Sequence, residues 1–397
     1  MVKSPAHNIF RLYIIKASKW FMLIMPIVVL FYQENGLGMR EVFILKSIYS
    51  ISIVVLEIPS GYFADVLGRK NTLIVGSLLG FIGFSVYSVT YGFWGFLIAE
   101  VVLGFGQSLI SGADSALLFD TLKQNNREND YMKHEGRMIS VGNFTEAIAG
   151  VLGGLLAALS LRYPYYAQTL IAFTAVPASF TLVEPKVHGV VLKRSFAKTM
   201  DVLKQTLLKN KQLMWNILYS SFVGASTLTM AWFVQPWFIS VDLPTSLFGV
   251  VWTILNLSVG LTALFAYKLE RFAGSRKTVI GFTILLALGF FGAALAGNYW
   301  GIFFLFLFYL ARGVATPVLK DYINRITGSD VRATILSVRS FVIRIIFSIW
   351  GPFYGWYIDA FSLKGAMAIA GMIFVLLSGI TCYFFLRTNF AKSKITG

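Results

Sequence analysis

Several ionisable side chains lie inside runs of apolar residues, where a charge is costly unless it is paired, hydrated or neutralised. The acidic ones fall in the first half of the chain and the basic ones mostly in the second: Glu57, Glu100, Asp114 and Glu146, against Arg312, Arg339 and Arg344. A carboxyl group in such surroundings can take up or release a proton as the surroundings change. The four carboxyl groups are therefore candidates for proton coupling, with Glu100 and Glu146 foremost.

Glu100 belongs to a polar row in the fourth apolar run. Glu100, Gln107 and Asp114 are spaced seven residues apart, so they drift by only about 20° per step around a helix and form one stripe. We interpret Glu100 as functional in preference to a purely structural hydrogen bond, whereas Asp114 fits a structural role equally well. Glu57 can be hydrated from the cytoplasmic side. Lys46, a further basic residue inside a run, is expected to extend its side chain toward an interface.

The segregation of opposite charges predicts ion pairs between the two halves of the chain. Burying an acidic group of the first half or a basic group of the second half without a counter-charge would cost too much free energy. Arg312 or Arg344 is therefore expected to pair across a cavity with Glu100 or Glu146. Arg339 belongs to the same basic set. A partly hydrated pair of this kind could hold one conformation of the protein and still break at modest cost.

Neutral polar and aromatic residues indicate what the cavity could bind. Gln33 and Gln235 are placed alike, late in the first and seventh runs, and Gln107, Trp232 and Tyr354 are further candidates for the lining. A surface of this kind suits an amphiphilic organic substrate better than a sugar or an inorganic ion. Belts of aromatic residues at the membrane interface are the alternative explanation for most of the aromatic side chains.

These side chains need membrane-spanning helices to position them. Of 397 residues, 57% are hydrophobic and 13% charged, and the mean hydropathy is +0.71, which is more apolar surface than a soluble globule can bury. Continuous apolar runs favour helices over barrel strands. At roughly 20 residues per crossing, the sequence predicts an all-α polytopic membrane protein with twelve transmembrane helices. The predicted spans are 12–33, 41–63, 72–90, 94–118, 137–160, 165–183, 213–239, 247–267, 278–296, 300–319, 333–357 and 365–386.

The net charge of +16, from 34 Lys and Arg against 18 Asp and Glu, reports on topology. With both termini cytoplasmic, the predicted cytoplasmic segments carry 27 basic residues, and the opposite side carries Arg40, Arg162 and Lys364. This asymmetry follows the positive-inside rule, so nucleic acid binding is not needed to explain the charge. The first helix is interpreted as uncleaved. Cys382 has no second cysteine with which to form a disulfide or a metal cluster, and we expect it to pack.

The longest polar stretch divides the chain into two repeats. The sequence predicts an N-terminal six-helix half over 1–183, a basic cytoplasmic linker over 184–212 and a C-terminal six-helix half over 213–397. Three patterns recur at an offset of 206 or 207: Gly68-Arg69-Lys70 and Ser275-Arg276-Lys277, Trp94-Gly95 and Trp300-Gly301, and Asp114 and Asp321. Two pseudo-symmetric halves around a midplane site are typical of secondary transporters.

The turn between the second and third predicted helices carries the most specific motif. Its matches to the signature loop of the major facilitator superfamily are Gly61, Asp65, Gly68, Arg69 and Lys70. Helix count, linker and repeat extend this resemblance over the whole chain. The resemblance implies an alternating-access carrier whose first, fourth, seventh and tenth helices line a central cavity. It also implies that the loop latches the cytoplasmic side of the outward-open state, with Asp65 facing the eleventh helix. Glu270, in the matching loop of the second half, is not at the spacing of Asp65, so the latch is expected to be asymmetric. A solvated turn is the plainer alternative.

Glycine patterns resemble those of the twelve-helix drug:proton antiporters within this superfamily. In the fourth helix Gly104 and Gly106 follow Glu100 by four and six residues, where those antiporters carry an Arg, so the charge is reversed here. The fifth helix carries Gly150, Gly153 and Gly154 in place of the antiporter pattern Gly-Pro, two residues, Gly-Gly. Small residues at this spacing are also how any two membrane helices approach closely.

Together these features predict a secondary active transporter, with proton-coupled efflux of amphiphilic, drug-like compounds as the first hypothesis. A proton-coupled importer or a facilitator of a single metabolite is the alternative within transport. A membrane receptor or membrane enzyme is disfavoured, because the sequence shows no P-loop and its three His lie outside the apolar runs. We expect a monomer in the bacterial inner membrane, surrounded by lipid and driven by the proton gradient. We expect no catalytic residues, cofactor, metal or nucleic acid.

Overall fold

The chain folds almost entirely into α-helices. The computed structural model describes residues 7–185, 210–327 and 332–390, and no β-strand occurs within these ranges. Residues 186–209, most of the predicted linker, lie outside the described residues. Helices suit the apolar runs because each one satisfies its own backbone hydrogen bonds in lipid.

Packing divides the chain into two units. The first contains Met1–Lys193 together with Pro244–Thr253, and the second contains Arg194–Leu243 and Ile254–Gly397. The short segment Pro244–Thr253 lies in the predicted C-terminal half of the sequence, yet it packs with the first unit.

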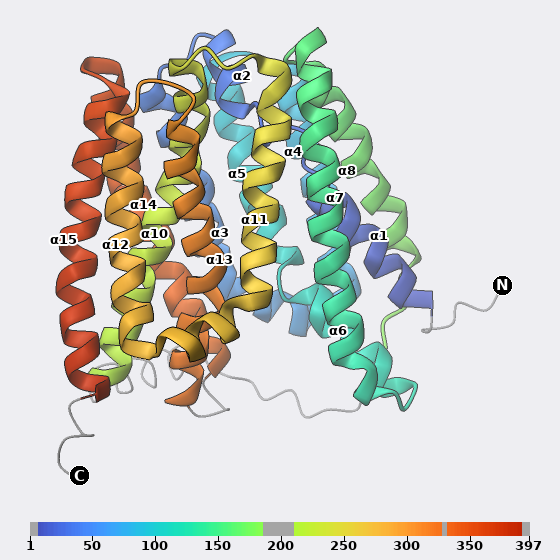
Figure 1. The fold of residues 1–397 in the computed structure, drawn as a ribbon. Coiled ribbons are helices and arrows are strands. Elements are labelled where there is room, and N and C mark those ends of the chain that lie inside the picture. The colour runs from blue at the N-terminus through green and yellow to red at the C-terminus, as the bar shows by residue number, and fades with distance from the viewer. Residues whose placement is uncertain (1–6, 186–209, 328–331, 391–397) are drawn as a thin grey trace. The chain divides into compact units, whose positions relative to one another are not determined.

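The first unit is built from the helices of the first half (Figure 1). In chain order its elements are α1 (Asn8–Trp20), α2 (Val28–Glu34), α3 (Met39–Leu67), α4 (Arg69–Val89), α5 (Gly92–Ile110), α6 (Ala113–Gln124), the 3₁₀ helix η2 (Glu128–Asp130), α7 (Tyr131–Leu159) and α8 (Tyr163–Thr181).

Two predicted spans of this unit are broken. The first span is divided into α1 and α2 by residues 21–27, which include Pro26, a residue without an amide donor. Within the break the Leu23 amide donates to Gln168 Oε1 of α8 at 2.8 Å. The fourth span is divided into α5 and α6 at Gly112, whose φ of +89° is a conformation that favours glycine. The breaks place helix ends inside stretches that hydropathy alone treats as continuous.

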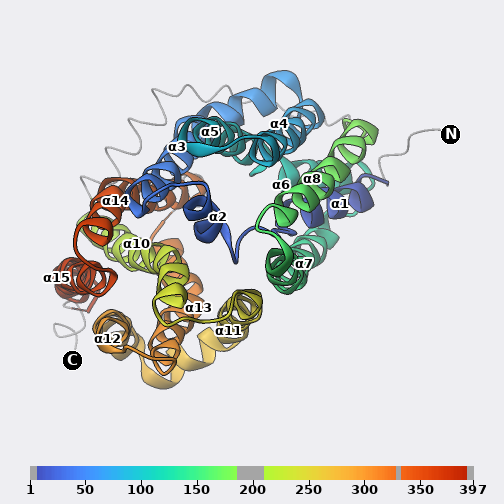
Figure 2. The same ribbon diagram turned by 90° about the horizontal axis from the view of Figure 1, so that it is seen from above.

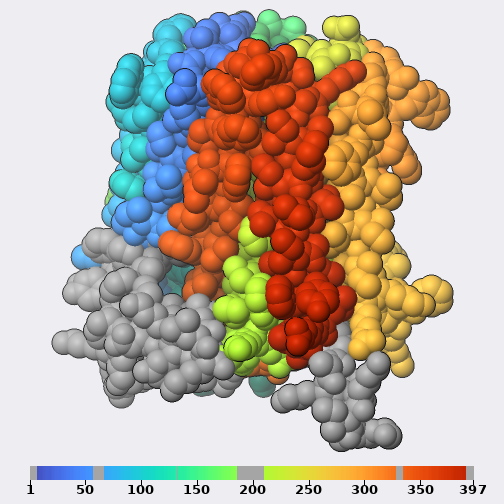
Figure 3. All heavy atoms as spheres, turned by 90° about the vertical axis from the view of Figure 1, so that its left-hand side faces the viewer, coloured from blue at the N-terminus to red at the C-terminus, as the bar shows by residue number. Residues whose placement is uncertain are grey.

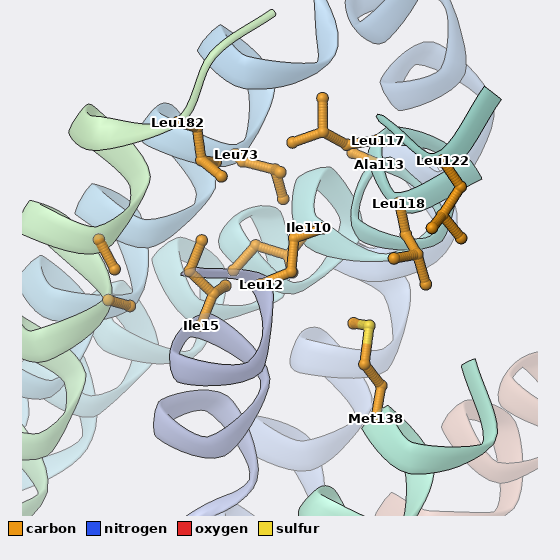
Figure 4. Packing of buried hydrophobic residues seen from close by; sticks show 12 residues of the cluster. Leu12, Ile15, Leu73, Ile110, Ala113, Leu117, Leu118, Leu122, Met138 and Leu182 are labelled. Carbon is orange, nitrogen blue, oxygen red and sulfur yellow. The ribbon is translucent and has the colours of Figure 1, made fainter. Parts of the chain in front are cut away.

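A cluster of buried apolar side chains holds one end of the first unit together (Figure 4). Leu12 of α1, Leu73 of α4, Leu118 of α6 and Met138 of α7 belong to it. Leu117, also in α6, is fully buried there. These contacts fix α1 and α6 against one another, which positions the polar residues that both helices carry.

The second unit contains the helices of the second half. They are α10 (Lys211–Ser240), α11 (Thr245–Ala273, of which the first residues pack with the first unit), α12 (Ser275–Leu295), α13 (Gly301–Arg325), α14 (Arg332–Ala360) and α15 (Leu363–Phe390). Within this unit α15 lies beside α10 and α12 (Figure 2).

The outer side of α15 is apolar. Met372, Leu376, Ile380 and Tyr383 expose 59%, 63%, 46% and 60% of their surface, and their spacing puts them on one helix face. Figure 3 shows α15 in red next to α14. A face of this kind suits lipid. Cys382, next to Tyr383, turns inward and is a buried free thiol, as expected of a packing residue.

The described helices account for all twelve predicted spans. Nine helical segments in the described part of the chain are long and apolar enough to cross a membrane, and α1 with α2, α3 and α8 occupy the other three predicted spans. The chain is a multi-pass, all-α membrane protein with six helical spans in each half. Several helices run past their predicted ends, since hydropathy marks only the apolar part: α7 begins at Tyr131 and α13 ends at Arg325.

The two halves share a local repeat. Gly68 precedes α4 with a φ of +84°, and Gly274 precedes α12 with a φ of +79°. Both helices are 21 residues long. The recurring loop pattern seen in the sequence therefore marks the same turn in each half.

Candidate functional site

Glu100 lies at the centre of a buried polar cluster in the first unit. Its side chain is 2% exposed and forms an ion pair with Lys46 of α3. Tyr32 of α2 and Tyr87 of α4 donate hydrogen bonds to the same carboxylate oxygen, at 2.6 and 2.7 Å. Three donors satisfy one acceptor oxygen, so the carboxylate charge is both paired and hydrogen-bonded, as a buried charge requires.

Aromatic side chains surround this cluster. Phe96 packs on the Tyr87 ring at 5.4 Å between centroids, and Tyr165 of α8 packs on the same ring at 5.3 Å. Tyr165 is fully buried, and its hydroxyl has no hydrogen-bond partner among the described residues. An apolar surrounding of this kind strengthens the attraction between Lys46 and Glu100, because it excludes water.

The cluster corrects one expectation and adds partners that the sequence analysis missed. The prediction that Lys46 extends toward an interface is wrong: Lys46 is 8% exposed and pairs with Glu100. Tyr32 and Tyr87 were not predicted as members of the site. The signal available in the sequence was that Lys46 and Glu100 are both charged in apolar runs, in the same half.

The predicted stripe of Glu100, Gln107 and Asp114 is interrupted. Gln107 follows Glu100 on α5 and is half-buried, but Asp114 lies on α6, beyond the break at Gly112. The expectation of one continuous stripe is therefore wrong, because it assumed an unbroken helix.

Asp114 has its own partner. Its Oδ2 is 3.0 Å from Lys16 Nζ of α1, and its Oδ1 accepts the Ser115 amide at 2.8 Å. Asp114 is 4% exposed and stands in the first turn of α6, where the helix dipole favours a negative charge. Ser115 Oγ donates to Glu135 Oε1 of α7 at 2.9 Å. The structure thus joins Lys16 of α1 to a carboxylate of the fourth predicted span.

The signature-like loop is anchored at Arg69. Its guanidinium forms an ion pair with Asp120 of α6 and donates to the Ala116 carbonyl at 2.6 Å. The Glu184 carboxylate accepts the amides of Arg69 and Lys70 at 2.9 and 2.7 Å, which caps the N-terminus of α4. Neither Asp120 nor Glu184 was singled out from the sequence. The side chains of Glu57 and Asp65 and the surroundings of Gly61 lie outside the part of the chain that the structure describes.

The matching loop in the second unit is held differently. Glu270, at the end of α11, accepts hydrogen bonds from Ser275 Oγ at 2.6 Å and Tyr322 Oη at 2.7 Å. The carboxylate that stabilises this turn thus comes from the preceding helix, whereas the first loop takes Glu184 from beyond α8.

The glycines of α7 let neighbouring backbone segments pack closely against this helix. A Cβ on Gly153 would overlap the Leu23 carbonyl oxygen in the break of the first span, and a Cβ on Gly154 would lie 2.9 Å from the Gly249 amide nitrogen at the start of α11. Thr253, in the same segment, donates to the Ala147 carbonyl at 3.2 Å. Glu146 is half-buried one turn before Gly150 on this helix.

The basic candidates of the second half differ in exposure. Arg339 is 8% exposed, and its Nε donates to Ser220 Oγ of α10. Arg344 is half-buried and Arg312 is exposed. Pairing of Arg312, Arg339 or Arg344 with carboxylates of the first half stays a prediction.

The polar and aromatic cavity candidates also differ. Gln33 is exposed and contacts Met39 Sδ at 3.7 Å, whereas Gln235 is 1% exposed. Trp232 is half-buried. Tyr354 is fully buried against Trp350 and Phe233, at 6.2 and 5.8 Å between ring centroids.

The chain resembles known membrane transporters in sequence and in structure. The sequence profile described as Major Facilitator Superfamily matches residues 12–243. The quinolone resistance protein NorA of Staphylococcus aureus (strain MRSA252) is 20% identical over 373 residues, covering 89% of this chain and 92% of NorA. A crystal structure of the nucleoside transporter NupG, in a mutant form, superposes with a TM-score of 0.79 at 15% identity, over 96% of this chain and all of NupG. The D-xylose–proton symporter superposes with a TM-score of 0.72 at 14% identity, over 97% of this chain and 98% of the symporter.

Proposed function

Because the chain belongs to the major facilitator superfamily and is a membrane transporter, we propose that it exports amphiphilic organic compounds by alternating access, in exchange for protons. We place it in the bacterial inner membrane with both termini in the cytoplasm. The observation that supports efflux is the similarity to a quinolone resistance protein over 89% of the chain. The likeness to the nucleoside and sugar transporters, at 15% and 14% identity, concerns the fold.

Proton coupling in this proposal rests on Glu146. Glu100 is held by Lys46 and by two phenol donors on one oxygen, and Asp114 is held by Lys16. Neutralising either carboxylate would leave a buried lysine without its counter-charge, which is costly. Glu146 is half-buried beside the close-packed glycines of α7. A carboxyl group on that surface could couple its protonation to a change in helix packing.

The test uses everted membrane vesicles with a fluorescent reporter of the proton gradient. We expect lipophilic organic compounds to collapse the gradient in vesicles with the wild-type protein, and vesicles with the Glu146→Gln variant to respond at background level while still exchanging substrate downhill. The Glu100→Gln variant serves as the comparison, and loss of folded protein is its expected defect. Full uphill transport by Glu146→Gln would reject the coupling assignment. Uptake of a single sugar or nucleoside, with no response to lipophilic compounds, would reject efflux.

A further inference from the structure

Lys16 of α1 pairs with a carboxylate in the interior of the first unit, and Lys19 follows it on the same helix. Lys16 Nζ is 3.0 Å from Asp114 Oδ2, and the two side chains are 13% and 5% exposed. The other oxygen of Asp114 accepts the Ser115 amide at 2.8 Å. The carboxylate is therefore already engaged at both oxygens.

Lys19 is left without a partner of its own. It lies one turn beyond Lys16 on α1 and is half-buried. The charged groups that act on it are Asp114, which attracts it, and Lys16, which repels it. Within the described part of the chain its ammonium group makes no hydrogen bond and no ion pair. The three charges leave one excess positive charge in the cluster.

Neighbouring charged groups do not remove this excess. Arg11, also on α1, adds a further positive charge, and its Nη1 is buried without a hydrogen-bond partner in the described residues. Glu135 of α7, which accepts from Ser115 Oγ, adds one negative charge that balances Arg11 in this count. Asp120 of α6 is paired with Arg69, so one positive charge is still in excess. The C-terminal dipole of α1 offers Lys19 partial compensation only.

The position of Lys19 in the span suits a ligand. Lys19 stands in the last turn of α1, about 16 Å along the helix axis from Asn8, directly before the break at residues 21–27. Broken spans near the middle of the bilayer are where transporters hold the charged groups of their substrates. Trp20, the next residue, is 37% exposed, and its ring lies over Gly142 of α7. Adjacent residues at this helix end thus carry an ammonium and an indole.

We propose that Lys19 binds the carboxylate of an amphiphilic organic anion, which makes organic acids a substrate class of this transporter. The proposal rests on the proposed function and specifies its substrate. An ammonium group offers three donors, and a carboxylate there would neutralise the excess charge while an aromatic body packs near Trp20. An apolar neutral substrate would leave that charge uncompensated.

The experiment compares three probes that share one naphthalene ring, with the purified protein in phosphatidylcholine vesicles, so that one probe is the only organic anion added. The probes are 2-naphthoate, 2-naphthamide and trimethyl(2-naphthyl)ammonium, and binding is measured by quenching of tryptophan fluorescence. A charged hydrogen bond inside a protein is worth about a factor of ten in affinity. We therefore expect 2-naphthoate to bind about tenfold more tightly than 2-naphthamide, and the ammonium probe to bind most weakly.

Variants test whether Lys19 causes the tighter binding of 2-naphthoate relative to 2-naphthamide. Lys19→Gln should reduce the ratio of the two affinities to about one, Lys19→Arg should keep it, and Lys133→Gln, at an exposed position of α7, should leave it unchanged. Equal binding of the acid and the amide by the wild-type protein would overturn the proposal, and so would a preference that survives in Lys19→Gln. Transport of lipophilic cations without any preference for the acid would reject Lys19 as an anion site and leave efflux standing, whereas transport of sugars alone would reject efflux itself.

Discussion

At the scale of single residues, the polar cluster around Glu100 shows how one buried charge dictates several contacts. A carboxylate removed from water needs a counter-charge and donors, and Lys46, Tyr32 and Tyr87 supply them from three different helices. Because all three meet on one oxygen, the cluster ties α2, α3 and α4 to α5. The charge reversal at Glu100, relative to the Arg of the antiporter pattern, is therefore matched inside the same half by Lys46.

Removing one member of this pair should cost more than removing both. Lys46→Met leaves Glu100 buried without its counter-charge, and we expect a loss of about 3–5 kcal/mol in the free energy of unfolding. The double variant Lys46→Met with Glu100→Met should recover much of this loss. Thermal unfolding in detergent measures both.

Arg127→Met is the matched control, since Arg127 pairs with Asp130 at an exposed site where the side chains are 52% and 36% accessible. Exposed pairs contribute little, so this variant should unfold like the wild type. A double variant less stable than Lys46→Met alone would contradict the assignment of the pair.

The sequence singles out a residue where the chemistry is local, but it does not identify a partner that lies far away in the sequence. Glu100 stands out because a carboxyl group in an apolar run demands an explanation. Its partner Lys46 is 54 positions away, and nothing in the spacing selects it over the arginines of the second half. Asp120 and Glu184 escaped attention because acidic residues near the ends of predicted spans look solvated.

At the scale of helices, hydropathy finds the spans but not their breaks. Gly112 and Pro26 were visible in the sequence, but each lies in a stretch apolar enough to be taken as one helix. Whether a glycine bends the chain or packs against a neighbour depends on tertiary contacts, as Gly112 and Gly153 show. The stripe prediction for Asp114 failed for this reason.

Gly153 offers a sharp test of the packing on the first-span break. A Cβ there would overlap the Leu23 carbonyl oxygen, which is a backbone atom and moves aside less easily than the end of a flexible side chain. We expect Gly153→Ala to cost about 1–3 kcal/mol by overpacking and to lower transport. Stability in detergent and transport in vesicles are the measurements.

Gly136 of the same helix is the control, because a Cβ on Gly136 would meet nothing within 4 Å. Alanine is the better helix former by about 1 kcal/mol, so Gly136→Ala should be neutral or stabilising. Normal stability and transport in Gly153→Ala would show that α7 and the break are not tightly packed.

At the scale of the whole molecule, the twelve spans were predictable from the apolar runs, and the internal repeat was predictable from motifs that recur at a fixed offset. Gly68 and Gly274 adopt the same positive φ before helices of equal length, so the offset seen in the sequence corresponds to a structural repeat. The grouping of Pro244–Thr253 with the first unit was not predictable, since it arises from contacts of Gly249 and Thr253 with α7.

The predicted pairing between halves is tested by suppression. Arg312→Ala should disable transport, because it leaves a first-half carboxylate without its partner, and the defect should be partly relieved by Glu146→Gln. Downhill substrate exchange in vesicles is the readout, since Glu146→Gln is itself expected to lose gradient-driven transport. Arg325→Ala, on the same helix but 63% exposed and paired with Asp321, should retain transport, and an Arg312→Ala protein that transports normally would refute the pairing.

The solitary thiol of α15 makes the natural chain a convenient background for spectroscopy. Cys382 is 6% exposed and has a packing role, so bulky maleimide and nitroxide reagents should leave it unmodified while they react with cysteines introduced at exposed sites. Pairs of spin labels, one at exposed Ile139 of α7 and one at exposed Leu376 of α15, would then report interspin distances without prior removal of native cysteines. Distance distributions recorded at two pH values, with and without 2-naphthoate, would measure the populations of the states in the proposed alternating-access cycle.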